Sequence, residues 1–132
     1  MDAVDGLTSP WPAVEDESEA YSLFQRGMRF LEEQHPGQAA LLLGRALRLE
    51  PDKHSIREGL AQAEFAFGRH RQAAEHFAAI VASAPDNDYA HYCLGRCLLR
   101  LSRGDEARIH LRLACALKPR SALYQRAVDE VR

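Results

Sequence analysis

The chain has 132 residues, of which 46% are hydrophobic and 27% are charged, an ordinary composition for a single soluble globular domain. No apolar stretch approaches about 18 residues, and the acidic N-terminus has no apolar core, so we expect neither a membrane span nor a secretory signal. The formal net charge is −2, and the charges of the body are interspersed, which disfavours nucleic-acid binding.

Residues 1–19 differ in composition from the rest of the chain. They carry six acidic residues and no lysine or arginine, whereas residues 20–132 carry 17 basic and 13 acidic ones. Trp11, the only tryptophan, lies between Pro10 and Pro12. We expect residues 1–19 to form an acidic tail that is disordered or draped over the body. This tail is either a solubilising segment or a placeholder ligand for a groove of its own or a neighbouring chain.

The remainder of the chain repeats itself at a constant interval. Three sets of residues recur, and within each set the interval between successive members is the same. They are the prolines Pro51, Pro85 and Pro119; the alanines Ala39, Ala73 and Ala107; and the large apolar residues Leu43, Phe77 and Leu111. Several recurrences in one phase indicate a repeat architecture. Each proline is expected to end a helix, because it lacks an N–H group and disfavours helix at the preceding residue.

These residues resemble the tetratricopeptide repeat, whose pattern runs Trp-x-x-Leu-Gly-x-x-Tyr, then Ala-x-x-x-Phe, then Pro over about 34 residues. The resemblance implies an all-α fold, an α-solenoid of three antiparallel helix–turn–helix repeats with a C-terminal capping helix. The repeats would be residues 20–53, 54–87 and 88–121, within a domain of residues 20–132. The amphipathic segment of about residues 121–131 would be the cap, or else the first half of a truncated fourth repeat.

Glycines mark two kinds of position in this pattern. Gly27 and Gly95 are expected where the first helix of a hairpin approaches the second closely. Gly68 and Gly104 are expected in the turn between the two helices, where a positive φ is tolerated or needed. The second repeat departs from the pattern, with Arg57 in place of Trp and Glu64 in place of Tyr, and we expect both near the surface.

The sequence carries no catalytic signature. It has no nucleophile–base pairing, phosphate loop, dinucleotide fingerprint or HExxH motif, so we predict no enzyme and no cofactor. Cys93, Cys97 and Cys115 lack the spacing and the additional ligands of a metal site. We interpret them as small buried hydrophobic residues and predict no metal.

The resemblance implies a binding surface on the concave face, which the first helix of each repeat lines. Projecting the repeat onto this chain gives a candidate peptide-binding groove of Tyr21, Phe24, Met28, Leu31, Phe65, Tyr89, Tyr92, Arg96, Leu99 and Arg100. Aromatic and Met anchors with an occasional Arg suit a peptide-accepting groove. The alternative is that these side chains add contacts to the core or form a dimer interface.

The resemblance also implies a negative expectation. Tetratricopeptide co-chaperones hold the acidic C-terminal tails of heat-shock proteins with a carboxylate clamp of Lys, Asn and Arg. The matching positions here are Phe24, Met28, Gly59, Tyr89 and Cys93, none of which can bind a carboxylate by charge. We therefore expect an apolar or aromatic-bearing segment in the groove, with Arg96 and Arg100 holding an acidic flank.

We predict a protein–protein interaction module, an adaptor or chaperone that binds an extended or apolar segment of a partner. The alternative is a scaffold or assembly protein, a homodimer for example, whose apolar face mediates self-association. Besides a protein partner, the chain's own tail with Trp11 is a candidate occupant, whereas nucleic acid and membrane are not. The use of 15 arginines against two lysines suggests a bacterial origin, and we expect a cytoplasmic location.

Overall fold

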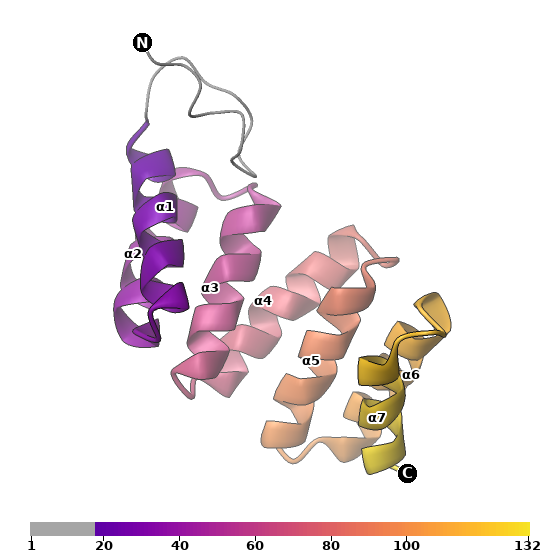
Figure 1. The fold of residues 1–132 in the computed structure, drawn as a ribbon. Coiled ribbons are helices and arrows are strands. Elements are labelled where there is room, and N and C mark those ends of the chain that lie inside the picture. The colour runs from indigo at the N-terminus through magenta and orange to yellow at the C-terminus, as the bar shows by residue number, and fades with distance from the viewer. Residues whose placement is uncertain (1–17) are drawn as a thin grey trace. The chain divides into compact units, whose positions relative to one another are not determined.

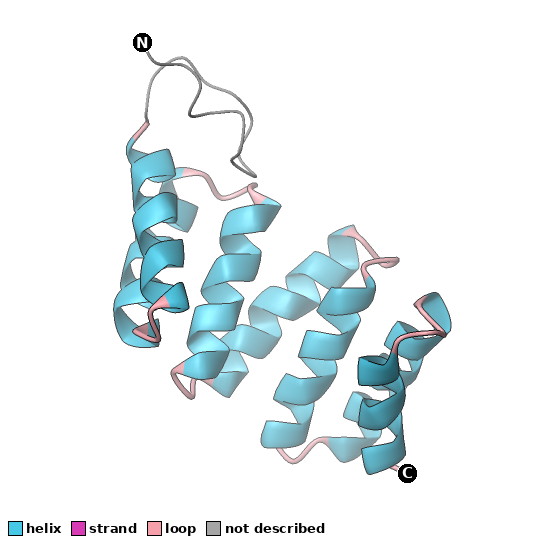
Figure 2. Cartoon of the chain, viewed as in Figure 1, coloured by secondary structure: helices cyan, strands magenta, loops and turns pink. Residues whose placement is uncertain are grey.

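The computed structural model describes residues 18–132, and this part of the chain is helical without any strand (Figures 1 and 2). The helices are α1 Glu19–Glu32, α2 Pro36–Leu49, α3 His54–Ala66, α4 His70–Ser83, α5 Asp88–Arg100, α6 Gly104–Leu117 and α7 Ala122–Glu130. The predicted all-α class and the helix after the third repeat are confirmed. Of the predicted tail, residues 1–19, only Ser18 and Glu19 are described, and they cap and begin α1. The rest of the tail, residues 1–17, lies outside the described residues.

The chain divides into two compact units, residues 1–63 and residues 64–132, and the division falls within α3. In the first unit α1 packs along α2, while in the second α5 packs against α4 and α6, and α7 packs against α6. Each unit has its own set of buried apolar side chains.

The three prolines lie just beyond the ends of α2, α4 and α6. The last helical residues are Leu49, Ser83 and Leu117, two residues before each proline and one repeat period apart. Because a proline disfavours helix at the residue before it, each of these helices ends at the same phase of the repeat. The sequence therefore sets the length of the second helix in every hairpin.

The turn within each repeat is a left-handed helix cap. Positive φ angles occur at Gln34 (66°), Gly68 (91°) and Ser102 (61°), which occupy the same phase of the three repeats. The next residue in each turn donates its N–H to a carbonyl five residues earlier, at 2.8 Å, 2.7 Å and 2.9 Å in turn. This is the hydrogen bond of a Schellman cap. Gly68 was predicted at such a position, but the expectation for Gly104 was wrong, since it begins α6.

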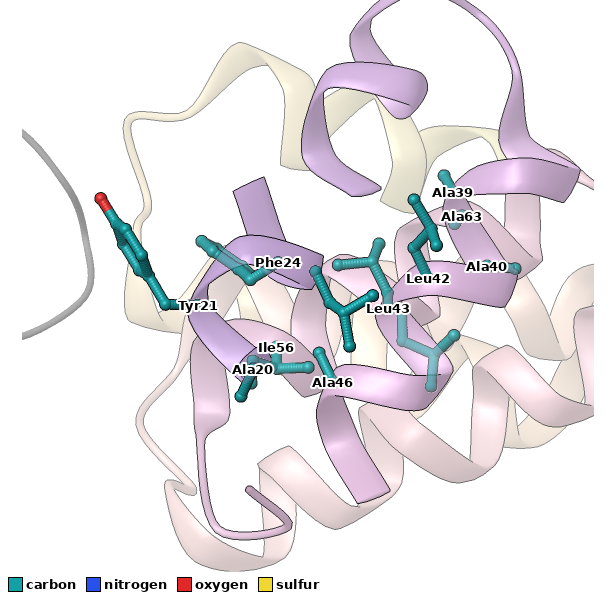
Figure 3. Packing of buried hydrophobic residues seen from close by; sticks show 12 residues of the cluster. Ala20, Tyr21, Phe24, Ala39, Ala40, Leu42, Leu43, Ala46, Ile56 and Ala63 are labelled. Carbon is teal, nitrogen blue, oxygen red and sulfur yellow. The ribbon is translucent and has the colours of Figure 1, made fainter. Parts of the chain in front are cut away.

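The core of the first unit fills the space between α1 and α2 (Figure 3). Leu43 and Ala46 of α2 are fully buried, together with Ile56 of α3. A Cβ atom added to Gly27 would lie 2.7 Å from Cγ of Leu43. The predicted close approach at Gly27 is therefore present, and Leu43 is the large side chain that occupies the space.

The second unit repeats this contact between α5 and α6. A Cβ atom on Gly95 would lie 2.7 Å from both Cγ and Cδ2 of Leu111, and 3.3 Å from the backbone oxygen of Ala107. We expect Gly95→Ala to lower the free energy of unfolding by about 1–3 kcal/mol, because the added methyl group overpacks this contact. Urea unfolding would measure the loss, with Gly104→Ala as control, since nothing lies within 4 Å of that added atom. Equal losses in both variants would contradict this account.

The second repeat corrects one expectation. Glu64 is buried, with 7% of its surface exposed, although it was expected near the surface. Arg57 is half-buried, and its Nη2 donates a 3.3 Å hydrogen bond to the carbonyl of Pro51. Among the large apolar side chains of this repeat, Phe67 is exposed, at 51%. The position that the repeat pattern gives to Tyr is thus an interior one even when a carboxyl group occupies it.

Burial also accounts for two of the three cysteines. Cys93 and Cys97 lie in the core of the second unit, Cys115 is half-buried, and all three are free thiols. Burial raises the pKa of the Cys97 thiol to about 11, which keeps it protonated and unreactive at neutral pH.

None of the helices in residues 18–132 is both long and apolar enough to cross a membrane.

Candidate functional site

The four predicted groove residues of α1 belong to the interior of the first unit. Tyr21 and Phe24 are 4% and 5% exposed and form part of the core cluster. Met28 and Leu31 are partly buried and pack against that cluster. A Cβ atom on Gly59 of α3 would lie 2.8 Å from Sδ of Met28, so this thioether fills space between helices. Their burial differs from the exposed position expected for a groove.

The six predicted residues of the second unit are accessible. They are Phe65 at the end of α3 and Tyr89, Tyr92, Arg96, Leu99 and Arg100 along α5, and we call them the α5 patch. Tyr89 and Leu99 are 39% and 40% exposed, both arginines are exposed, and Phe65 and Tyr92 are half-buried. The spacing of the α5 residues places them along one face of that helix.

Two guanidinium groups surround Phe65. The Cζ atom of Arg96 lies 4.7 Å from the centre of the Phe65 ring, and that of Arg100 lies 5.4 Å away. The Arg96 Cζ atom also lies 5.7 Å from the centre of the Tyr92 ring. These are cation–π distances, and such contacts stabilise an exposed pair by about 0.5–1 kcal/mol. They hold the arginine heads over the aromatic rings, so the patch presents charge and apolar surface together.

Tyr92 of the patch packs against α7, and Tyr89 packs against Tyr92. The ring centres of Tyr92 and Tyr124 are 5.2 Å apart, and those of Tyr89 and Tyr92 are 6.3 Å apart. Tyr124 is buried, and its hydroxyl donates a 2.5 Å hydrogen bond to Oδ2 of Asp88 at the start of α5. Burial, and then this hydrogen bond, raise the pKa of Tyr124, so it stays a donor at neutral pH.

The C-terminal helix was predicted from the sequence, whereas the contact of Tyr124 with Asp88 and Tyr92 was not. Tyr124 is the buried residue of α7, three residues after the Ser121 cap, whose Oγ accepts a 3.2 Å hydrogen bond from the Tyr124 N–H. A lone aromatic residue on a capping helix is a signal that something packs beneath it. The partner, 36 residues earlier, is set only by the tertiary fold.

The electrostatic character of the α5 patch is positive. Within residues 18–132 neither Arg96 nor Arg100 forms an ion pair with a carboxylate, whereas Arg103 and Arg108 are paired with Glu106 and Asp105. Guanidinium groups with no carboxylate partner in the described part of the chain attract carboxylates, and each can bind one in a bidentate manner. The neighbouring Phe65 and Tyr92 rings offer apolar contact to the same ligand.

A pocket of the second unit lies elsewhere. It has a volume of about 470 Å³, and none of the α5 patch residues lines it. Leu94 and Leu98 are among the apolar residues of its wall, and Arg71, Glu75 and His110 are among the polar ones. Its wall holds two arginines, Arg71 and Arg103, and two glutamates, Glu75 and Glu106, so the pocket favours no single charge type, unlike the α5 patch.

His110 also contacts a buried histidine on α5. Nδ1 of His91 lies 3.0 Å from Nδ1 of His110, and Nε2 of His91 lies 2.8 Å from the carbonyl oxygen of Pro85. Burial, and then the neighbouring His91, lower the pKa of His110. No group of three or more His, Cys, Asp or Glu side chains in the described residues could hold a metal ion.

The sequence was compared with models of known protein families. A family model described as tetratricopeptide repeat matches residues 24–87 and again residues 60–122. No curated protein sequence matches the chain significantly.

Solved structures agree on the fold at low sequence identity. One is the first TPR of Spaghetti (RPAP3) bound to the HSP90 peptide SRMEEVD, with a TM-score of 0.79, 16% identity, and coverage of 88% of this chain and 92% of that one. The second TPR domain of human RPAP3, in complex with the HSP70 peptide SGPTIEEVD, gives a TM-score of 0.78, 16% identity, and coverage of 86% and 94%. The Arabidopsis OM64 TPR domain gives a TM-score of 0.80, 18% identity, and coverage of 86% and 93%. The fold class is that of the TPR α-solenoids, and with the family model matching most of its length, this chain belongs to the tetratricopeptide repeat family.

Proposed function

We propose that the protein is a protein-interaction module that binds an extended partner segment, as an adaptor or chaperone, through the α5 patch. The observation that carries the proposal is the stacking of the Arg96 and Arg100 guanidinium groups on the half-buried Phe65 ring, with Arg96 also beside Tyr92. A ligand segment that carries an acidic residue next to an apolar or aromatic one satisfies both halves of this surface. No enzymatic activity is part of the proposal.

The ligand is expected to differ from those of the similar solved structures. The RPAP3 domains are bound to peptides that end in EEVD. In this chain the positions that match the carboxylate clamp carry Tyr89 and the buried Cys93 on α5, and Phe24 and Met28 in the core region of α1. These side chains supply no positive charge. We therefore propose that the acidic residue of the ligand lies within the segment, beside Arg96 and Arg100.

Fluorescence anisotropy of labelled peptides tests the proposal on the full chain. The probe is the synthetic peptide Ser-Pro-Trp-Pro-Ala-Val-Glu-Asp-Glu, which combines an aromatic residue with three carboxylates. We expect Arg96→Gln or Phe65→Ala to weaken its binding by roughly tenfold, about 1.4 kcal/mol, because each removes one half of the patch. Binding should also weaken as salt is raised, since the acidic flank is held by exposed charges.

Two controls make this result specific. Arg71→Gln removes an exposed arginine of α4 outside the patch and should leave binding unchanged. The peptide SRMEEVD should bind more weakly than the probe. Equal effects of the Arg71 and Arg96 variants, or tighter binding of SRMEEVD, would contradict the proposed site.

The chain's own tail is one proposed occupant, because it has the same combination of acidic residues and Trp11. Trp11 is the only tryptophan, so its fluorescence emission reports on the tail alone. If the tail occupies the patch of its own or a neighbouring chain, Phe65→Ala should shift the emission to longer wavelength. The alternative function, self-association through the patch, instead predicts that Phe65→Ala abolishes an oligomer while the emission is unchanged.

A further inference from the structure

Helix α6 carries an apolar stripe on its surface. Ile109, Leu113 and Leu117 are four residues apart, so they lie along one face of the helix. Their side chains are 59%, 42% and 41% exposed. They belong neither to the α5 patch nor to the wall of the 470 Å³ pocket. Contiguous exposed apolar surface of this kind marks an interaction site.

The repeat itself does not require this stripe. The equivalent positions of repeat two, in a helix of the same length, are Glu75, Ala79 and Ser83. The equivalent positions of repeat one are Leu41, Arg45 and Leu49, where a charge interrupts the apolar side chains. A hairpin of this family therefore folds with polar groups at these positions. The uninterrupted stripe of α6 is therefore not needed to pack its own hairpin.

The charges around the stripe are arranged to match a second copy of the same helix. Asp105 and Glu106 occupy the first turn of α6, and the Asp105 side chain is 99% exposed. Lys118 and Arg120 follow the C-terminal end. When a second α6 is laid antiparallel against the first, Leu113 meets Leu113 and Ile109 meets Leu117. The acidic end then meets the basic end on both sides, and the helix dipoles oppose each other favourably.

We propose that the α6 stripe binds a second copy of this chain through antiparallel α6–α6 pairing. A self-complementary surface, on which residue i contacts j while j contacts i, produces a closed two-fold dimer. No other helix of residues 18–132 has two acidic residues in its first turn, which makes α6 distinct in this respect. The contact is small, so we expect a weak dimer that forms at micromolar concentration. The α5 patch is not part of it.

Sedimentation equilibrium of the full chain, from low to high micromolar concentration, tests the pairing. The wild-type protein should pass from monomer to dimer. Leu113→Arg sets two like charges face to face at the two-fold axis and should weaken the dimer by roughly tenfold or more. The matched control is Leu41→Arg in repeat one, where Leu41 is the counterpart of Ile109 and is 58% exposed. It should leave the dimer unchanged, and circular dichroism would verify that both variants are folded.

Two further variants act in ways that misfolding cannot imitate. Arg112 is exposed and precedes Leu113, so the pairing brings it near the Arg112 of the second copy, and Arg112→Gln should tighten the dimer. Asp105→Arg should weaken the dimer, and adding Arg120→Asp should restore it. A monomer at every concentration, a dimer insensitive to Leu113→Arg, or a mass that increases beyond two copies would overturn the proposal. If Phe65→Ala abolished the dimer while Leu113→Arg left it intact, the interface would lie on the α5 patch, and the proposal would be overturned. Retained peptide binding by Leu113→Arg separates the two sites.

Discussion

Replacing Phe77 by alanine is expected to destabilise the protein by about 3–5 kcal/mol, the cost of deleting a large buried ring and leaving a cavity. Phe77 lies on α4 and is 1% exposed, which makes it one of the largest fully buried side chains among the described residues. It occupies the repeat position that Leu43 and Leu111 occupy in the other two hairpins, and both of these are also buried. Phe77 is the bulkiest of the three side chains, so its replacement by alanine should cost more stability than the same change at Leu43 or Leu111.

Urea unfolding followed by far-ultraviolet circular dichroism measures this loss. Phe67→Ala is the matched control, because Phe67 is the same residue type in the same repeat but is 51% exposed. Its only described ring contact is the Cζ atom of Arg69, 5.1 Å from the ring centre. We expect that variant to lose less than about 1 kcal/mol. Similar losses for the two variants would show that Phe77 is not the central residue of this core.

The repeat phase made the fold predictable from the sequence. A constant period places proline, alanine and a large apolar residue at fixed points, and each acts through a local effect. Proline ends the helix before it, and alanine permits close approach wherever the partner helix lies. These effects need no knowledge of distant residues. The ends of α2, α4 and α6 and the burial of Ala39, Ala73 and Ala107 accordingly follow the sequence prediction.

The turns were predicted less well, because the left-handed position depends on backbone geometry more than on residue type. Glycine occupies it only in the second repeat, while Gln34 and Ser102 occupy it in the others. A non-glycine residue with positive φ costs roughly 1 kcal/mol, which the Schellman hydrogen bonds offset. Residue type therefore predicted the left-handed position correctly at Gly68 and wrongly at Gly104.

In the candidate site too, the position of a residue in the repeat predicts less than its tertiary neighbours decide. Helical phase grouped residues of α5 that are exposed or half-buried in the structure, since residues on one face share their surroundings. Phase alone gave Tyr21 and Phe24 the same role, yet these side chains belong to the core of the first unit. Which face of a helix is covered depends on its tertiary neighbours, which one repeat cannot specify. The support of Tyr92 by Tyr124 was invisible for the same reason.

Glu64 carries the second large expected effect. Its carboxyl group is buried, and Oε1 has no hydrogen-bond partner among the described residues and lies 3.6 Å from Nε2 of His76. Burial raises the pKa of Glu64 from 4.5 to about 7, although Arg69 lowers it, and Glu75 adds a smaller increase. A difference of this size corresponds to about 3 kcal/mol between the two protonation states.

The direction in which stability changes with pH follows from proton binding. The folded pKa lies above the unfolded one, so between pH 4.5 and about 7 the folded state holds more protons than the unfolded state. Raising the pH through this range therefore lowers stability, and the loss is complete above about pH 7. Glu64→Gln cannot ionise, so we expect it to be more stable than the wild type by about 1–3 kcal/mol at mildly alkaline pH. At mildly acidic pH the difference should shrink.

Thermal or urea unfolding of both proteins across this pH range provides the measurement, and the difference between the two profiles isolates Glu64. Subtraction matters because the lowered pKa of His110 changes stability within the same pH range but with the opposite sign, so that stability is lost as the pH falls. That contribution is common to both proteins and cancels. Glu130→Gln at the end of α7 is the control, since this carboxylate is exposed. A Glu64→Gln variant that is less stable at alkaline pH would mean that the buried carboxylate is stabilised by a partner, and that its burial is favourable.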